Sequence, residues 1–461
     1  MPAFHKTNSR CHFQFTNSQH ATAHGGQVLV DALCRRFGLW QKIAQTPFLD
    51  PRTRTGSGFA PESLIAQLLF SLTSGGITLA DAQRLGQDPV LLELIGLQKG
   101  ADESTLGQWL RAQTKESVRA LHRLNADFVR DVLAEVKPGR VRHAGQLEVF
   151  FDDTEIEVYG KKIAGARLNY EGNRALSWQT LWLGPFLLDG ILDGAGDVSQ
   201  HLPVLLQEHR ALWENQASYL YADSASSSAE YLGAIAGAGF TRWSVSYNKW
   251  TQVLDRLAGE LPAEQWSAEQ TETWADGTGH RRQYAWIKHL PGENDQARTF
   301  ATVRRKQEGE LFWRYYYVAC EAGDIQDPPA VFERHALKGA KEQGFSQVLS
   351  DLDLHHPPCL ELIANQAFYA IAMLAFNVLM ALKVLDLPDD AQGWRVRSII
   401  RHLLTVPVTV SYHARYRTAT VCVATGWLRW WRLFMDQWVP KRKPGRPAKE
   451  PGAGGSEPSA G

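Results

Sequence analysis

The feature of the sequence that most constrains the fold is a long apolar run, AFYAIAMLAFNVLMALKVL, from Ala367 to Leu385. The run nearly reaches the length of a membrane span, but it contains Asn377 and Lys383, and no second span lies near it. A helix that is apolar on every side and does not lie in a membrane must be buried in a large protein core. The run therefore predicts a buried central helix with other elements packed around it.

The length and composition of the chain allow a core of this size. The chain has 461 residues, 44% of them hydrophobic, which suits two or three globular domains. Lys+Arg and Asp+Glu are both 49, so any contact with nucleic acid must come from local patches. The five cysteines form no Cys-x-x-Cys pair, and the N-terminus lacks the apolar run of a signal peptide. We expect a cytoplasmic protein without a membrane partner.

The N-terminal part of the chain is expected to be helical. Residues 1–25 are predicted to be a flexible segment and residues 26–140 an α-helical domain, because apolar residues recur there at helical spacing. Within it, Asp102 and Ser104 are capping residues that predict a short helix over DESTLGQWLRAQ. That helix suits either the second helix of a helix-turn-helix or an ordinary bundle helix, and the sequence leaves both open.

An α/β pattern follows over residues 141–247. The segment QLEVFFDDTEIEVYG, from Gln146, reads as a strand that reaches two aspartates and continues with alternating residues. A second apolar strand, SYLY, ends at Asp223 and is followed by the predicted helix AEYLGAIAGAGF. Open α/β sheets place their sites at the carboxyl ends of their strands, so these aspartates are candidate site residues.

Residues 248–320 are predicted to form a β-rich insertion, and residues 321–390 to complete the α/β core. The segments TETWADG, RQYAWIKHL, ARTFATVRRKQ and ELFWRYYYVAC read as strands separated by turn residues. The insertion contains Arg304 and Arg305, which we expect to contact DNA. Trp313 lies on the strand that leads back to the core, where it suits either stacking on a base or core packing.

A helix with charged residues on its apolar stripe is predicted between His335 and Leu349. Relative to Glu342, Phe345 and Leu349 follow at helical spacing, and His335 and Lys338 precede it on the same stripe. Buried unpaired charges are costly, so the stripe indicates either a different helix register or a site where an ion is bound.

Three carboxylates therefore have an unusual context. They are Asp152 or its neighbour Asp153 at one strand end, Asp223 at another, and Glu342 on the inward side of a helix. Oxygen donors on separate rigid elements are the ligand set that a pair of hard divalent cations needs, with positions left for phosphate and water. A bound cation would also stabilise a buried glutamate.

The same segments carry a family resemblance. FDDTEIEVYGKK, YLYADS, HALKGAKEQ and ANQAFYAIAMLAFNVL, in this order, resemble the successive blocks of DDE transposases, specifically the bacterial insertion-sequence family thirteen-eighty. The resemblance covers nearly the whole chain. It implies a ribonuclease H-like mixed sheet with flanking helices, interrupted by the β-rich insertion and preceded by a helical domain that binds the transposon end. It also implies two Mg²⁺ ions, or Mn²⁺ in their place, held by the three acids.

The resemblance also assigns the site residues. An aspartate two residues before a threonine falls on Asp152, in preference to Asp153, and an aspartate followed by a serine falls on Asp223. A Tyr, Arg, Glu and Lys signature on one helix falls on His335, Lys338, Glu342 and Leu349. Lys338 can neutralise a phosphate but lacks the bidentate fork of arginine. His335 could still donate to a phosphate, so both are expected DNA contacts, whereas Leu349 cannot contact a phosphate. The departures therefore affect the expected DNA contacts more than the metal ligands.

What the resemblance implies is a transposase that cleaves phosphodiester bonds at transposon ends and joins the 3′-hydroxyl ends to target DNA. Its partner is double-stranded DNA, and pairing of two ends implies a homodimer on DNA. Trp313 would stack on a flipped base. The alternatives are an inactive, transposase-derived DNA-binding protein and a metal-dependent nuclease without strand transfer. A zinc site at His355, His356 and Cys359 is a further alternative, although it lacks a fourth ligand.

The C-terminal part of the chain is basic. Residues 391–438 alternate arginines with aromatics, a pattern that suits either a nucleic-acid surface or buried tryptophans on an amphipathic helix. Residues 439–461 are expected to be a disordered basic tail. Its Gly-Arg-Pro core resembles an AT-hook that would lie in a minor groove, although a generic basic tail fits equally well. The expected DNA contacts of this tail are Lys441, Arg442, Lys443 and Arg446.

Overall fold

The computed structural model describes most of the chain, in two units. The described residues are 20–52, 58–169, 171–196, 199–248, 251–273, 278–290, 297–321, 327–413, 416–423 and 427–432, without the side chains of 340–343 and 416. The first unit is Met1–Cys422 and the second is Val423–Gly461, in which the described residues 428–432 are helical. The predicted DNA contacts of the basic tail lie outside the described residues. They are Lys441, Arg442, Lys443 and Arg446.

The first unit begins with a group of helices. Several start with a side-chain cap: Asp102 accepts a hydrogen bond from the backbone N–H of Thr105 at 2.7 Å, and Thr114 forms a capping box with Ser117. The Trp109 Nε1 donates to the carbonyl of Leu49, so the short helix after Asp102 packs against the segment that follows α2. These helices are α1 (Gln27–Arg36), α2 (Leu39–Gln45), α3 (Pro61–Thr73), α4 (Leu79–Leu85), α5 (Pro89–Ile95), α6 (Glu103–Arg111) and α7 (Lys115–Glu135).

A large mixed sheet follows, as the sequence predicts for a mixed α/β fold. Among the described residues it has 11 strands, in the order β4-β5-β3-β7-β8-β12-β11-β10-β9, with β2 on β3 and β6 on β5. The strands β3, β7 and β8 are parallel, and the other neighbours are antiparallel. The strands nearest the centre are β2 (Arg142–His143), β3 (Gln146–Glu157), β4 (Arg167–Leu168), β5 (Arg174–Leu183), β6 (Phe186–Gly194), β7 (Ser218–Ala222) and β8 (Arg242–Tyr247).

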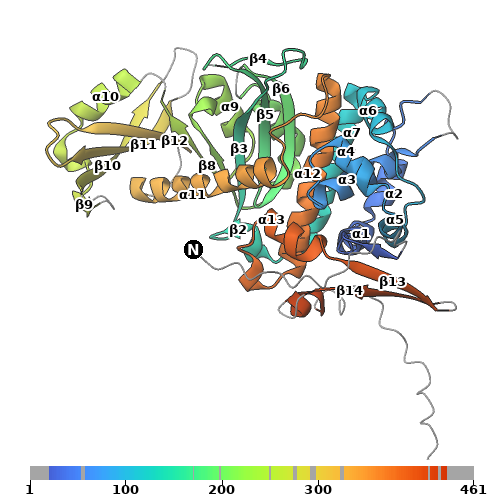
Figure 1. Ribbon diagram of the computed structural model, residues 1–461. Coiled ribbons are helices and arrows are strands. Elements are labelled where there is room, and N and C mark those ends of the chain that lie inside the picture. Colours follow the sequence, from blue (N-terminus) through green and yellow to red (C-terminus); the bar gives the residue numbers. More distant parts are fainter. Residues whose placement is uncertain are drawn as a thin grey trace, which may run out of the picture. The chain divides into compact units, whose positions relative to one another are not determined.

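The β-rich insertion continues this sheet. Strand β12 pairs with β8 from Tyr317–Tyr247 to Cys320–Ser244, so the insertion shares hydrogen bonds with the α/β part (Figure 1). Its strands are β9 (Gln270–Thr273), β10 (Gly279–His289), β11 (Arg298–Gln307) and β12 (Arg314–Cys320). One element was not predicted, the helix α10 (Thr251–Glu260), which buries Leu254 and Ala258 and packs against β10.

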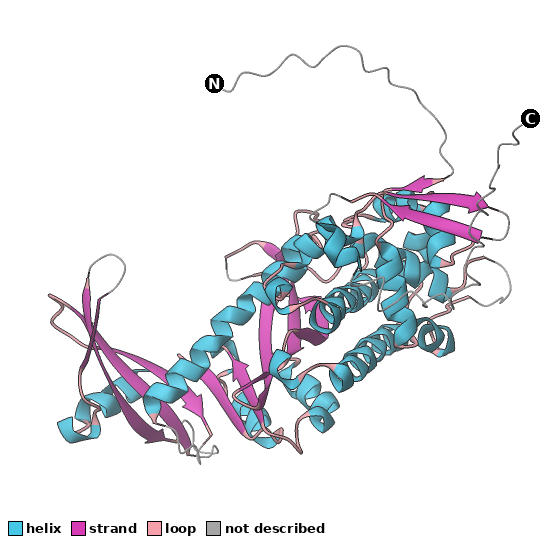
Figure 2. Cartoon of the chain, turned by 90° about the horizontal axis from the view of Figure 1, so that it is seen from below, coloured by secondary structure: helices cyan, strands magenta, loops and turns pink. Residues whose placement is uncertain are grey.

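Helices flank the strands on both sides (Figure 2). On one face α12 (Leu362–Asp386) packs its Tyr369 on Trp178 of β5, with ring centroids 5.2 Å apart, and α11 (Pro328–Ser346) lies beside it. On the other face the backbone N–H of His201, at the start of α8 (Leu202–His209), donates to Gln179 of β5 at 2.9 Å. Helix α9 (Ala229–Gly237) packs against α8.

The apolar run that constrains the fold forms α12, and the prediction of a buried central helix is confirmed. Among the described residues it is the one helix long and apolar enough to cross a membrane, but 94% of its most apolar window is buried in the protein. Its polar side chains are hydrogen-bonded: Asn377 donates to Asn125 of α7 at 2.7 Å, and Lys383 donates to the carbonyl of Trp394. Burial lowers the pKa of Lys383.

The last elements of the first unit follow α12. They are α13 (Val396–Ile399) and the hairpin β13 (Val408–His413) and β14 (Tyr416–Val421), which pairs with β1 (Ala21–Thr22). Part of the predicted basic and aromatic region is thus a hairpin, and Tyr412 and Arg417 contact Glu93 on α5.

Candidate active site

Two of the predicted acids lie at the same edge of the sheet. Strands β3 and β7 are parallel neighbours, and Phe151 pairs with Ala222 as the last pair of their register. The next residues are Asp152 and Asp223, so the two aspartates lie side by side where the parallel pairing ends. Asp223 directly follows β7, but Asp152 lies inside β3, which continues to Glu157 beside β5, so the prediction that Asp152 stands at a strand end is wrong. Asp223 also begins a 3₁₀ turn, because its Oδ1 accepts a hydrogen bond from the backbone N–H of Ala225 at 3.0 Å.

The alternation of side chains along β3 decides which aspartate faces α11. Glu148, two pairs of residues before Asp152, lies 3.8 Å from Arg334 of α11, and the Oδ2 of Asp152 lies 3.7 Å from the Nζ of Lys338. Since every second residue of a strand points to the same face, Asp153 points away from α11. Its Oδ1 instead accepts a hydrogen bond from Ser177 at 2.7 Å. This geometry favours Asp152 over Asp153 as the residue that faces the helix.

Several carboxylates lie close together at this edge of the sheet and shift one another's pKa. The pKa of Asp153 is raised to about 7, mainly by burial and also by the negative charges of Asp152, Glu155 and Asp223, against the hydrogen bond from Ser177. In contrast, Lys338 brings one positive charge to Asp152, and both side chains are less than a fifth exposed. Negative charge is therefore concentrated at this edge, and its electric field attracts cations.

Helix α11 carries its predicted apolar stripe toward the sheet. Phe345 packs on Trp182 of β5 with ring centroids 5.4 Å apart, and Phe345 and Leu349 are both buried. At Gly344 an added Cβ would lie 3.3 Å from the ring of Trp182, so this glycine permits the helix to approach the strand closely.

Glu342 occupies a defined position on that stripe. It follows Lys338 by four residues and precedes Phe345 by three, and both neighbours face the sheet. The side chain of Glu342 lies outside the described part of the structure. The helix backbone nevertheless places residue 342 one turn beyond the contact between Lys338 and Asp152.

His335 has partners that sequence reasoning did not predict. Its Nδ1 lies 2.8 Å from the hydroxyl of Ser244 and its Nε2 lies 2.7 Å from the hydroxyl of Ser246, both on β8. Burial, and secondarily the charge of Lys338, lower its pKa to about 4, so the imidazole is neutral and donates through one nitrogen while it accepts through the other. In this geometry neither nitrogen is left for a phosphate, which argues against the expected DNA contact.

The neighbouring Arg334 is a second position that sequence reasoning missed. Its guanidinium is buried, lies 5.0 Å from the ring centroid of Tyr219 and 5.6 Å from that of Tyr221, and faces Glu148. These contacts join the first half of α11 to β3 and β7. The sequence shows an arginine next to the predicted stripe of α11. Its role could not be predicted, because its partners lie on strands that are distant in the sequence.

The basic and aromatic residues of the insertion stack on each other. Arg304 lies between two indole rings, 4.2 Å from the centroid of Trp266 and 4.7 Å from that of Trp313, and it donates to Gln283. Burial lowers the pKa of Arg304. Arg305 lies 5.5 Å from the ring centroid of Tyr316. Trp313 is therefore partly covered in the free chain.

Two apolar side chains next to Trp313 are far more exposed. Leu311 and Phe312 lie in the turn between β11 and β12 and are 82% and 80% exposed. The sequence analysis placed both residues in the predicted strand ELFWRYYYVAC, but the strand begins only at Arg314, so their exposure could not be predicted.

The predicted zinc alternative does not form a cluster. Cys359 is buried, and the backbone around it is hydrogen-bonded to Asn365, while His356 is exposed beside Asp353. Within the described ranges, the donors grouped closely enough to hold an ion are those of Asp189, Glu208 and His209, all within 4.8 Å of one another.

With this geometry established, a comparison with protein families decides the identity. The family model described as transposase DDE domain group 1 matches residues 5–433. The chain belongs to this family of DDE transposases. The family implies an enzyme of DNA transposition that binds DNA and uses divalent metal ions. No match was found among curated protein sequences.

Proposed function

We propose that this transposase belongs to the insertion-sequence family thirteen-eighty, with a ribonuclease H-like core in which Asp152, Asp223 and Glu342 hold two Mg²⁺ ions. The observation that carries the proposal is the parallel register of β3 and β7, which sets Asp152 and Asp223 side by side. The stripe of α11 supports Glu342 as the third ligand, because residue 342 follows the contact between Lys338 and Asp152 by one turn.

The residues present fit a pair of hard cations. The donors are carboxylates on three separate elements, and the charges of Asp152 and Asp223 add to burial in raising the pKa of the neighbouring Asp153, which supports a site for cations. When bound, two divalent ions activate a water for attack on a phosphodiester and stabilise the leaving 3′ oxygen. Mn²⁺ would serve with the same oxygen ligands.

The neighbouring residues have separate roles in this proposal. Lys338 lies close enough to Asp152 to pair with its carboxylate and to meet a phosphate of the bound strand. His335 and Arg334 fix α11 to β8, β7 and β3 through the contacts described above, and so position Glu342 without touching DNA. Asp153 holds Ser177 on the opposite face of the strand.

The DNA partners follow from the same chemistry. The substrate is double-stranded DNA, first at the transposon ends and then at the target, where the released 3′-hydroxyl is joined. Residues 26–140 are proposed to bind the transposon end, and a homodimer would pair two ends. Arg304, Arg305 and the basic tail would contact DNA outside the metal site.

An assay of both steps tests the proposal and separates its alternatives. A labelled duplex that carries the element's own end is incubated with the protein and Mg²⁺, and cleavage and joining to a target duplex are measured separately. The proposal predicts both products, and their loss when a chelator removes the metal. Cleavage without joining would indicate a nuclease, and binding without cleavage would indicate an inactive DNA-binding protein.

A further inference from the structure

The segment that follows α12 brings arginines close to the end of α11. Residues 391–407 contain three arginines and no acidic residue. Helix α13 begins in this segment and packs against the turn that follows α11 (Figure 1). We propose that Arg395 and Arg397 bind the DNA backbone beside the metal site, on the side of Glu342 opposite to Lys338. The inference rests on the proposed function and adds a specific phosphate contact to it.

A buried carboxylate holds both guanidinium groups. The side chain of Asp351, at the end of the π-helical turn Gln347–Asp351 that follows α11, is 1% exposed. Its Oδ1 lies 3.1 Å from Nη2 of Arg395 and 3.4 Å from Nε of Arg397. Its Oδ2 accepts a hydrogen bond from the backbone N–H of Arg397 at 3.2 Å. Two guanidinium groups on one carboxylate leave one positive charge in excess.

Both guanidinium groups keep donors for a ligand. The side chains of Arg395 and Arg397 are 47% and 53% exposed, although the carboxylate that holds them is buried. Nε and Nη2 of Arg395 bond to Asp351 and to Ser346. Nη2 of Arg397 donates to the carbonyl of Ser350 at 2.9 Å. Within the described part of the chain, Nη1 of neither arginine makes a hydrogen bond. An arginine held in this way presents a fixed fork to a phosphate.

The guanidinium of Arg395 is bonded to α11 one helical turn beyond Glu342. Its Nη2 donates to the hydroxyl of Ser346 at 3.1 Å, and Ser346 is the last residue of α11. Lys338, Glu342 and Ser346 follow one another at intervals of four residues, so they lie along one side of the helix. Since an α-helix rises about 1.5 Å per residue, Lys338 and Ser346 are roughly 12 Å apart along its axis. The position of Glu342 therefore has a cation on each side.

This side of α11 faces the part of the sheet that carries the acids. Ser346 follows His335 by eleven residues, which is about three helical turns, so the two residues share one flank of the helix. His335 lies 2.7 Å from the hydroxyl of Ser246 on β8. Ser246 is the next residue after the last pair between β7 and β8, as Asp223 is on β7. The flank therefore points to the carboxyl ends of the parallel strands, and Arg395 is bonded to it.

A strand of DNA is the ligand that fits these positions. One strand of a duplex carries a phosphate for about each 3.4 Å of helix axis, so roughly 12 Å span three to four nucleotides. A strand whose reacting phosphodiester lies at the metal site can therefore meet Lys338 on one side and Arg395 on the other. Leu349, in the turn that follows α11, is buried and apolar, so the positive charge at this end of the helix comes from Arg395 and Arg397 instead.

The same contacts also join α13 to the end of α11. Gln347, for example, accepts a hydrogen bond from the backbone N–H of Val396 at 3.1 Å. A role limited to this joint predicts that the two sides of the ion pair are equivalent, so that loss of Asp351 and loss of the arginines have the same consequences. A phosphate contact predicts that they differ, because the arginines meet DNA and the buried carboxylate does not.

The test compares the two sides of the ion pair by DNA binding as a function of salt. A fluorescently labelled duplex that carries the element's own end is titrated with the full chain in the presence of a chelator, so that the duplex is not cut. For Arg395→Gln/Arg397→Gln we expect the slope of log affinity against log salt to be reduced by about 1.8, because each lost phosphate contact lowers it by about 0.9. By the same relation, the affinity at about 0.1 M salt should fall by up to about sixtyfold.

Asp351→Asn should act in the opposite direction on DNA binding. It keeps both arginines and removes the negative charge beneath them, so the slope and the affinity should equal or exceed those of the wild type. Both this variant and the double arginine variant break the buried ion pair, so a thermal melt should show a lower melting temperature in each. Stability and DNA binding therefore change together if the contact is only structural, and separately if the arginines bind phosphate.

Arg210→Gln is the matched control. The Arg210 side chain is 41% exposed and lies 2.8 Å from Glu214, so it is also an arginine paired with an acid. It follows α8, which packs on the other face of the sheet. Arg395→Gln alone should lower the slope by about 0.9, whereas Arg210→Gln should not change it. This comparison decides the proposal even if Asp351→Asn does not fold. A wild-type slope in the double variant, or an equal loss in Asp351→Asn or Arg210→Gln, would overturn the proposal.

The outcomes also separate this contact from the proposed function. If the wild type cleaves and joins DNA but Arg395→Gln/Arg397→Gln binds it equally well, the phosphate contact is wrong and the enzymatic proposal stands. If the double variant loses its share of the slope while the wild type neither cuts nor joins, the arginines bind DNA on a chain that lacks the proposed activity.

Discussion

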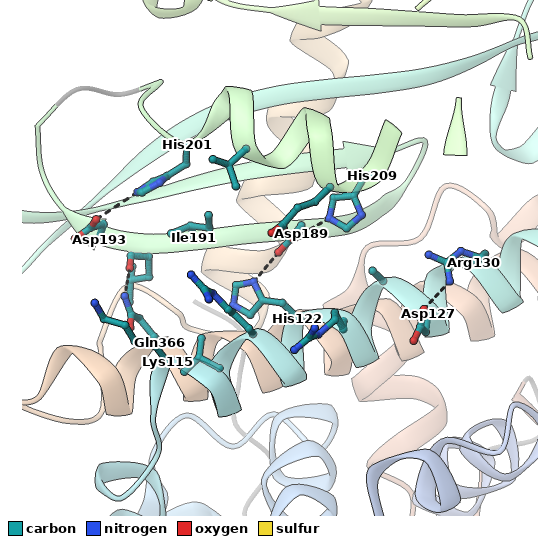
Figure 3. Close-up of a pocket in the computed structure, with 17 residues that line it drawn as sticks. Lys115, His122, Asp127, Arg130, Asp189, Ile191, Asp193, His201, His209 and Gln366 are labelled. Atoms are coloured by element: carbon teal, nitrogen blue, oxygen red, sulfur yellow. Dashed lines mark hydrogen bonds and ion pairs between the residues drawn. The ribbon is translucent and has the colours of Figure 1, made fainter. Parts of the chain in front are cut away.

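Two sites of this molecule place an aspartate in a partly or fully buried position, with opposite surroundings. At the sheet edge Asp152 lies beside Asp153, and burial together with the nearby carboxylates raises the pKa of Asp153 to about 7. Between α7 and α8, Asp189 accepts hydrogen bonds from the imidazoles of His122 and His209 (Figure 3), and its pKa is lowered against the effect of burial. The comparison teaches that several carboxylates at the edge share one field and suit cations, whereas both oxygens of Asp189 already have hydrogen-bond partners within the protein.

The sharpest difference should appear when each aspartate is replaced by asparagine. Asp152→Asn removes a proposed metal ligand, so cleavage should fall by about 1,000-fold or more, a loss of roughly 4 kcal/mol of transition-state stabilisation. The free energy of unfolding should change little or rise, because one of several like charges is removed. Rates under single-turnover conditions and a thermal melt measure the two effects. A matched Asp153→Asn variant should retain more activity, and the reverse order would assign the ligand to Asp153.

Asp189→Asn should show the opposite pattern. The variant leaves His122 and His209 without their carboxylate, and breaking a buried pair in this way costs about 3–5 kcal/mol of folding stability. Cleavage per folded molecule should change far less than in Asp152→Asn. Denaturant unfolding gives the stability, and an assay at low temperature gives the activity.

The same variant has a defined pH dependence. The folded pKa of Asp189 is below the unfolded value of about 3.9, so its contribution to stability is present above that pH and declines as the pH falls toward the folded pKa. The stability difference between the wild type and Asp189→Asn should therefore shrink below about pH 4. A difference that is constant with pH would contradict the ionic account of this contact.

The β-rich insertion also contains one aromatic side chain with partners, Trp313, and one that is exposed, Phe312. Trp313 stacks with Arg304, so Trp313→Ala should lower the stability of the insertion by about 1 kcal/mol or more. Phe312 is exposed, so Phe312→Ala should leave the melting temperature unchanged and slow end cleavage by up to about tenfold if this residue stacks on a base, a contact worth about 1–3 kcal/mol. If Trp313→Ala slows cleavage without changing stability, Trp313 and not Phe312 is the residue that stacks on a base.

An effect that appears only at acid pH concerns His335, which shares α11 with Lys338. Its pKa is lowered to about 4 in the folded chain and is near 6.5 when unfolded, so the unfolded chain binds a proton between these values that the folded chain does not. Stability should therefore fall as the pH is lowered from about 6.5 to about 4. In His335→Gln this part of the decline should disappear, while cleavage at neutral pH stays within a fewfold of the wild type. A loss of DNA binding in this variant would restore His335 as a DNA contact.

The sequence predicted those parts of the molecule that depend on local pattern. The alternation along QLEVFFDDTEIE located β3, and the apolar run located α12. The helical spacing predicted the buried positions of Phe345 on α11 and of Leu349 on the π-helical turn that follows it. The adjacency of Asp152 and Asp223 could be expected because parallel strands end at one edge.

Other features depend on contacts between distant segments. The hydrogen bonds from His122 of α7 and His209 of α8 to Asp189 of β6 join three separate elements, so they could not be predicted. Both ring nitrogens of His335 bond to serines of β8, a strand far away in the chain. The insertion was predicted as strands, but its continuity with the main sheet depends on the pairing of β12 with β8.

Glu342 offers the most direct test of the central claim. We would measure Mg²⁺-dependent cleavage of a labelled duplex that carries the element's own end, comparing the wild type with Glu342→Gln, and with Glu333→Gln as an exposed control on the same helix. The account predicts that Glu342→Gln binds DNA but does not cut it, whereas Glu333→Gln cuts like the wild type. Cleavage by Glu342→Gln at the wild-type rate would contradict the assignment of the third metal ligand and with it the proposed site.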